Sequence, residues 1–148
     1  MANRFLKELL AMPNNGLKPH HLGGYLTRRG PDGRIRFTYV IGNPPVERQK
    51  EYGEYSREKG RRLNVHPHHF SSWWSRRKRL KQYGGAIRTE DGGSLSFSGT
   101  NEMAEEALAL LIADARGHIT HENMLRVIKK SRNHLFIRFC AYYHLCGI

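Results

Sequence analysis

Two glycine-containing turns, each between segments of strand-like residues, constrain the fold of this chain more than any other feature. The first, at residues 30–33 (Gly-Pro-Asp-Gly), separates residues 25–29 from residues 34–41, where apolar and polar side chains alternate. Proline presets φ and glycine tolerates a positive φ, so this sequence is typical of a tight turn. The second turn, at residues 90–93, separates residues 86–89 from residues 94–98. The sequence therefore predicts two β-hairpins.

Helical periodicity and capping residues predict the other elements. Apolar spacing indicates helices at residues 3–12, 69–82, 100–116 and 120–131, the last two capped by Thr100 and Thr120, and strong helix formers indicate another at 46–59. The helix at 46–59 has few apolar residues, so we expect it to be mostly solvated. The final segment, 134–145, fits either a strand or a buried helix. The expected fold class is α+β, a single compact domain with two β-hairpins, four to five helices and a C-terminal helical scaffold.

The length and composition suit an intracellular globular domain. A chain of 148 residues is long enough to bury its own core as one domain. Cys140 and Cys146 have neither the spacing of a disulfide scaffold nor that of a redox motif, so we expect buried thiols in the cytoplasm, or in the nucleus if the source is eukaryotic or viral. No apolar run approaches the ~20 residues of a membrane span, and we expect no membrane partner.

The positive charge is concentrated in one part of the sequence. Lysine and arginine number 25 against 13 acidic residues, a formal net charge of +12. Residues 1–83 carry all of this excess, and residues 84–148 are close to neutral. An excess of this size favours a polyanionic partner. We therefore interpret residues 1–83 as the binding half and residues 84–148 as a hairpin with a helical scaffold.

The densest basic run follows a pair of tryptophans. On the predicted helix at 69–82, cations would cover most of the exposed surface, and arginine adds bidentate contacts to phosphate. Tryptophan could stack on unpaired bases, although both indoles could equally be core anchors beside solvated cations. Our leading hypothesis is a non-enzymatic DNA- or RNA-binding protein. Its candidate binding residues are Lys59, Arg61, Arg62, Trp73, Arg76, Arg77, Lys78, Arg79 and Lys81.

Histidines form a second pattern, because the Pro-His-His sequence at residues 19–21 recurs at residues 67–69. Imidazole is a common zinc ligand, but the spacing matches no recognised metal motif, so we expect no cofactor and keep zinc as a weak alternative. The candidate ligands would be His20, His21, His66, His68, His69, His118 and His121.

Two other functions remain open from the sequence. In the first, the protein is a small nuclease in which His66, His68 and His69 act as general acid and base on a phosphodiester, with His118 or His121 as further candidates. In the second, it is an effector or inhibitor that binds an acidic protein. A metal-dependent nuclease is disfavoured, because the glutamates of residues 47–58 have the spacing of helix-face ion pairs.

A turn at residues 99–101 precedes the predicted helix at 100–116 and resembles a phosphate-binding turn, since helix N-termini attract anions. Three glutamates, Glu102, Glu105 and Glu106, follow it directly. Their negative charge interacts favourably with the positive end of the helix dipole and would repel phosphate, so we expect a structural capping role for the turn.

Overall fold

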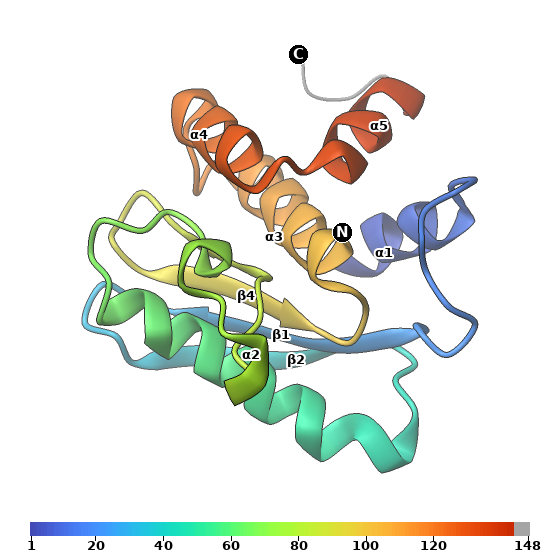
Figure 1. Cartoon of the computed structure of the whole chain (residues 1–148), viewed down its shortest axis with the longest axis horizontal. Helices are drawn as coiled ribbons and strands as arrows, with labels where there is room; N and C mark the ends of the chain where they lie inside the picture. Colours follow the sequence, from blue (N-terminus) through green and yellow to red (C-terminus); the bar gives the residue numbers. More distant parts are fainter. Residues whose placement is uncertain (144–148) are drawn as a thin grey trace.

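Both predicted hairpins form, and they join into one antiparallel sheet of four strands in the order β2-β1-β4-β3 (Figure 1). The structure, a computed structural model, describes residues 1–143. The strands are β1 (Gly23–Arg29), β2 (Ile35–Gly42), β3 (Ala86–Arg88) and β4 (Ser94–Ser98). In the first turn Gly33 has φ of 79° and donates its N–H to the Gly30 carbonyl at 3.0 Å, as the turn sequence predicts.

Helices cover both faces of the sheet (Figure 1). They are α1 (Ala2–Ala11), α2 (Gln49–Asn64), α3 (Glu102–Ala115), α4 (His121–Ser131) and α5 (His134–Tyr142). Helix α2 lies across one face, while α1 and α3 pack on the other with α4 and α5 beyond them. The α+β single domain is therefore confirmed.

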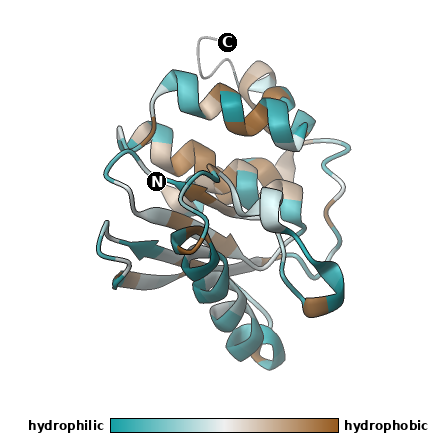
Figure 2. Cartoon of the chain, turned by 60° about the vertical axis from the view of Figure 1, so that its left-hand side comes forward, coloured by the Kyte–Doolittle hydropathy of each residue, from teal (hydrophilic) through white to brown (hydrophobic). Residues whose placement is uncertain are grey.

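The α3 face of the sheet is apolar and contains the core. Alternation along the strands places Leu26, Leu95 and Phe97 in this core, and each is nearly inaccessible to solvent. Helix α3 is buried continuously from Ala104 to Ala113, so it is the central element of the scaffold. Figure 2 shows its hydrophobic colouring against the hydrophilic α2.

The α2 face of the sheet is polar, and the expectation of a mostly solvated helix at 46–59 is wrong. Ser56 is fully buried and donates its hydroxyl to Thr27 Oγ1 at 2.8 Å. Ser96 Oγ in turn donates to the Ser56 carbonyl at 2.6 Å. Small and hydrogen-bonding residues, in place of aliphatic ones, therefore form the buried side of this helix. The helix also begins and ends later than predicted, at Gln49 and Asn64.

The predicted helix at residues 69–82 is absent. The segment contains only two 3-10 turns, Ser72–Ser75 and Lys78–Leu80, joined by extended residues. The Ser71 hydroxyl accepts the Trp73 N–H at 3.1 Å, which starts the first turn, and a β-bridge pairs Ser71 with Ile87. Serine side chains that bond the local backbone compete with helix in this way. We call residues 65–82 the basic loop.

The C-terminal half agrees more closely with expectation. Thr120 caps α4 by accepting the Asn123 N–H at 3.2 Å. The final segment is helical from His134 to Tyr142, which settles the choice between strand and helix. Cys140 is buried as expected, whereas Leu145 and Cys146 lie outside the described residues. Within residues 1–143, no helix has the length and apolar character required to cross a membrane.

Candidate functional site

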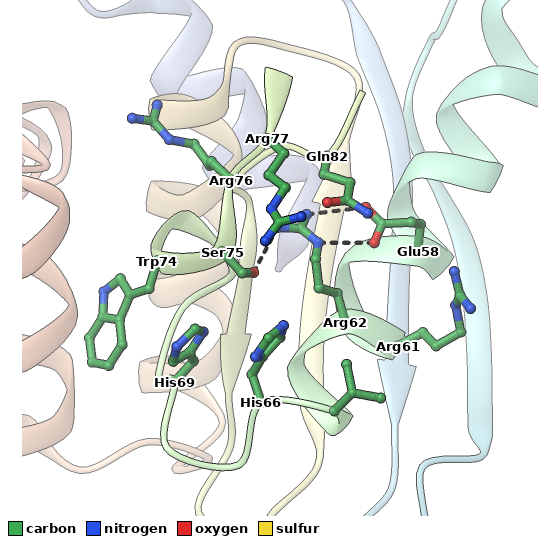
Figure 3. Close-up of a pocket in the computed structure, with 11 residues that line it drawn as sticks. Glu58, Arg61, Arg62, His66, His69, Trp74, Ser75, Arg76, Arg77 and Gln82 are labelled. Atoms are coloured by element: carbon green, nitrogen blue, oxygen red, sulfur yellow. Dashed lines mark hydrogen bonds and ion pairs between the residues drawn. The ribbon is translucent and has the colours of Figure 1, made fainter. Parts of the chain in front are cut away.

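A cleft of about 510 Å³ opens between the C-terminal end of α2 and the basic loop (Figure 3). Four arginines, two histidines and a single carboxylate line it. The lining residues are Glu58, Arg61, Arg62, Val65, His66, His69, Trp74, Ser75, Arg76, Arg77 and Gln82. We call this the arginine cleft. It combines the two patterns that the sequence analysis singled out, the basic run and the histidines.

Arg62 forms the back of the arginine cleft and is a structural residue. Its Nε and Nη2 bind the two oxygens of Glu58 at 3.0 and 3.1 Å. Its Nη1 donates to the Ser72 carbonyl and to Ser75 Oγ, both at 2.9 Å (Figure 3). The Arg62 side chain is only 5% exposed, so the expectation of a surface contact residue is corrected: Arg62 ties α2 to the basic loop.

Arg61 and Arg77 have a different environment. Both side chains are exposed, one extending from α2 and the other from the basic loop. Among residues 1–143, no carboxylate lies within ion-pairing distance of either guanidinium. Their charges are therefore available to an anion entering the cleft.

Arg76 makes two contacts within the protein, an ion pair and a cation–π contact. Its Nη1 lies 3.1 Å from Glu102 Oε2, and its guanidinium carbon lies 3.7 Å from the centre of the Trp73 ring. On another side, a Cβ at Gly84 would come within 2.7 Å of Trp73 Cε3, so only glycine fits there. Trp73, which we expected to contact nucleic acid, is thus sandwiched within the protein and does not line the arginine cleft.

Trp74, rather than Trp73, lines the arginine cleft. Its ring lies 5.6 Å from that of His69, edge to face, and His69 stacks on His66 at 4.6 Å with an angle of 7° between the rings. Within the described chain, His69 Nδ1 and Trp74 Nε1 are buried without a hydrogen-bond partner. Ring contacts, rather than hydrogen bonds, therefore hold these side chains.

Burial lowers the pKa of His69, with further lowering from the neighbouring positive groups, first His66 and then Arg88. A lowered pKa keeps the imidazole neutral near pH 7, which allows the two rings to stack without repulsion. His68, the third catalytic candidate, is exposed and does not line the cleft.

Arg88 on β3 fixes the histidine-bearing part of the basic loop. Its Nη2 donates to the carbonyls of Leu63 and His66 at 2.7 and 2.9 Å, and its Nε to that of His69 at 2.8 Å. One guanidinium thus holds the end of α2, through Leu63, to the loop backbone, through His66 and His69. Sequence analysis missed this role because it depends on a contact between distant segments.

The remaining basic candidates divide into buried and exposed residues. Lys59 is 1% exposed and lies 2.5 Å from Glu105 Oε2, so it is not a surface residue and the expectation for it is corrected. Lys78 is 69% exposed and 3.7 Å from Glu102. Arg79 and Lys81 are exposed at the tip of the basic loop, outside the cleft.

The candidate zinc ligands do not come together. His20 and His21 precede β1 and pack edge to face at 4.5 Å, whereas His66, His68 and His69 belong to the basic loop. His118 and His121 flank the start of α4 and are exposed. In the part of the chain that the structure describes, no group of three histidine, cysteine or carboxylate side chains could hold a metal ion.

The turn at residues 99–101 is occupied from within the protein. Glu105 Oε1 accepts the N–H groups of Gly99 and Thr100 at 2.9 and 3.1 Å. Asn101, rather than Thr100, caps α3 by accepting the Ala104 N–H at 2.8 Å. The turn therefore has the structural role that we expected, with the capping residue moved by one position.

Comparisons with known proteins provide no relative for this chain: no family model, curated protein or solved structure matches it.

Proposed function

We propose that this protein binds nucleic acid, with the arginine cleft as the contact site for the phosphate backbone. The observation that carries the proposal is the pair of exposed arginines, Arg61 on α2 and Arg77 on the basic loop, that line a cleft backed by the fixed Arg62. Guanidinium groups bind phosphate oxygens in bidentate geometry. With four arginines against Glu58 alone, the cleft attracts anions.

A chain of phosphates fits this surface better than a single small phosphate. Exposed Arg79 and Lys81 continue the positive charge beyond the cleft along the basic loop. Contacts at successive phosphates release counterions, which provides much of the affinity of nucleic-acid-binding proteins. The proposed binding requires no cofactor. It would take place wherever the protein meets DNA or RNA, in the cytoplasm or, for a eukaryotic or viral source, in the nucleus.

The test is binding of labelled RNA and DNA oligonucleotides, followed by fluorescence anisotropy at several salt concentrations. We expect association at low salt that weakens steeply toward physiological salt. If neither RNA nor DNA associates even at low salt, the proposal is wrong. Retention of an acidic protein partner after nuclease treatment would then favour the effector or inhibitor hypothesis.

Phosphodiester cleavage is a second candidate, favoured by one observation: His66 and His69 lie in the same cleft as the arginines. A neutral imidazole could accept a proton from the attacking hydroxyl, and a protonated one could donate to the leaving oxygen. However, the two rings stack face to face at 4.6 Å. Acid and base that act on opposite sides of a phosphate need to be further apart, so this geometry favours binding over cleavage.

Cleavage is tested by incubating labelled RNA and DNA with the protein, with and without a chelator. Product that persists with the chelator and disappears in both His66→Ala and His69→Ala would support histidine catalysis. Intact substrate in every condition would exclude it and leave the binding proposal in place.

A further inference from the structure

The wall of the arginine cleft opposite Arg61 is aromatic. Trp74, His69 and His66 follow one another along it, in edge-to-face contact at 5.6 Å and then in parallel stacking at 4.6 Å. Figure 3 shows the two imidazoles side by side, with the indole next to them. Behind this wall, Phe70 packs against Trp74 at 5.9 Å. Binding of phosphate alone would not require a row of aromatic rings, because phosphate is bound by cations and hydrogen-bond donors.

We propose that the arginine cleft selects single-stranded nucleic acid, with an unpaired base stacking on the aromatic wall while the arginines hold the flanking phosphates. This inference rests on the proposed nucleic-acid binding. Aromatic side chains that stack on bases, beside cations that follow the backbone, are the features by which proteins bind single strands. In a duplex the base faces are covered by their neighbours, so a duplex could use the arginines but not the wall.

The two tryptophans have different roles in this account. Arg76 covers Trp73 at 3.7 Å and Gly84 approaches the same ring, which leaves Trp73 as a structural residue. Trp74 lines the cleft, and Lys130 Nζ lies 5.7 Å from the centre of its ring. Trp74 is therefore the residue that reports on a stacked base, and Trp73, which does not line the cleft, can be replaced to isolate its signal.

The experiment uses the full chain carrying Trp73→Phe, which leaves Trp74 as the one indole. Its fluorescence is titrated with oligo(U), oligo(dT), a duplex of the same length, and heparin, which is a polyanion without bases. We expect quenching by the two single strands and little change with heparin. We also expect the single strands to bind at least about 5-fold more tightly than the duplex, since one stacked base is worth that much. The RNA and DNA arms show which strand is preferred.

A second variant separates stacking from folding. Trp74→Leu should lose about 5-fold or more in affinity for oligo(U) but retain its affinity for heparin. Trp74→Phe, which keeps an aromatic face, should recover part of the loss. Retained heparin binding shows that the arginines are still in place, and an unchanged circular dichroism spectrum shows that the domain is folded.

The possible failures are distinct. Equal affinity for single strand and duplex, without quenching of Trp74, would overturn single-strand selection and leave nucleic-acid binding intact. Absence of binding to all three nucleic acids would overturn the proposed function itself, and the inference with it.

Discussion

At the residue scale, three buried ionisable side chains show how polar groups are paired in the interior of a strongly basic chain. Lys59 is paired with Glu105 and also donates to the Phe97 carbonyl at 2.8 Å. Arg62 is bound by acceptors on all sides. Glu106 accepts hydrogen bonds from the side chains of Ser71 in the basic loop, Ser131 at the end of α4 and Asn133 just before α5. Each of these side chains joins segments that are distant in sequence, so each is a structural element of the fold.

We expect Lys59→Met to destabilise the protein by about 3–5 kcal/mol, because the substitution leaves Glu105 buried without its partner. Lys50→Met, on an exposed position of the same helix, should change stability by less than about 0.5 kcal/mol. Urea denaturation of both variants measures the difference. Similar stability of the two variants would mean that the buried pair does not form.

The pH dependence of stability tests Glu106. Burial raises its pKa above the ordinary value of 4.5, against the lowering effect of its three hydrogen-bond donors and of Arg76. The folded state therefore binds a proton that the unfolded state has lost. The resulting stability is complete below pH 4.5 and is lost as the pH rises through the folded pKa.

We accordingly expect the stability advantage of wild type over Glu106→Gln to shrink as the pH rises from 5 to 8, since glutamine stays neutral throughout. Thermal denaturation at each pH measures this advantage. Glu122→Gln, at an exposed site on α4, is the control and should show no such trend. A constant difference between wild type and Glu106→Gln would contradict the raised pKa.

At the scale of elements, the basic loop shows where sequence reasoning succeeds and fails. The hairpins were predictable because turn chemistry and alternation are local properties, and α4 because Thr120 caps it. Residues 69–82 have helical spacing of their aromatic side chains, but Ser71 and its bridge to Ile87 divert the backbone. That bridge joins the basic loop to β3, and no local pattern encodes it.

The candidate site was predictable to a similar extent. Charge density pointed to the basic loop, and the Pro-His-His copy at residues 67–69 lies in it, whereas the copy at residues 19–21 lies before β1. The sequence could not distinguish Arg62, which is bonded within the protein, from Arg61, which is exposed. Nor could it tell which of two adjacent tryptophans faces the cleft, because the positions of Arg76 and Gly84 around Trp73 decide that.

The hydrogen bonds from Arg88 to the basic loop can be tested by mutation. Arg88→Met removes two hydrogen bonds to basic-loop carbonyls and one to the Leu63 carbonyl of α2, and we expect faster amide exchange at residues 66–70 together with weaker oligonucleotide binding. Arg138→Met is the matched control, because Arg138 also donates to two loop carbonyls, those of Pro13 and Asn14, away from the cleft. Arg138→Met should lower the stability of the protein without changing its affinity for the oligonucleotide. Equal loss of affinity in both variants would contradict a specific role for Arg88.

At the scale of the whole molecule, binding and scaffold are arranged as layers. The apolar core lies between the sheet and α3, and the basic surface lies on the side of α2 and the basic loop. This layering cuts across the division of charge at residue 83 in the sequence, because α1 belongs to residues 1–83 but packs against α3. It leaves one side of the domain as a rigid support for the arginine cleft on the other.

The measurement that tests this account most directly is the salt dependence of oligonucleotide affinity in Arg61→Ala/Arg77→Ala. For a single strand, each lost phosphate contact should reduce the slope of log affinity against log salt by about 0.7, and this double variant by about 1.4. Arg34→Ala/Lys129→Ala removes the same charge from exposed sites outside the cleft and should retain the wild-type slope. Equal slopes for the two double variants would contradict the arginine cleft as the binding site.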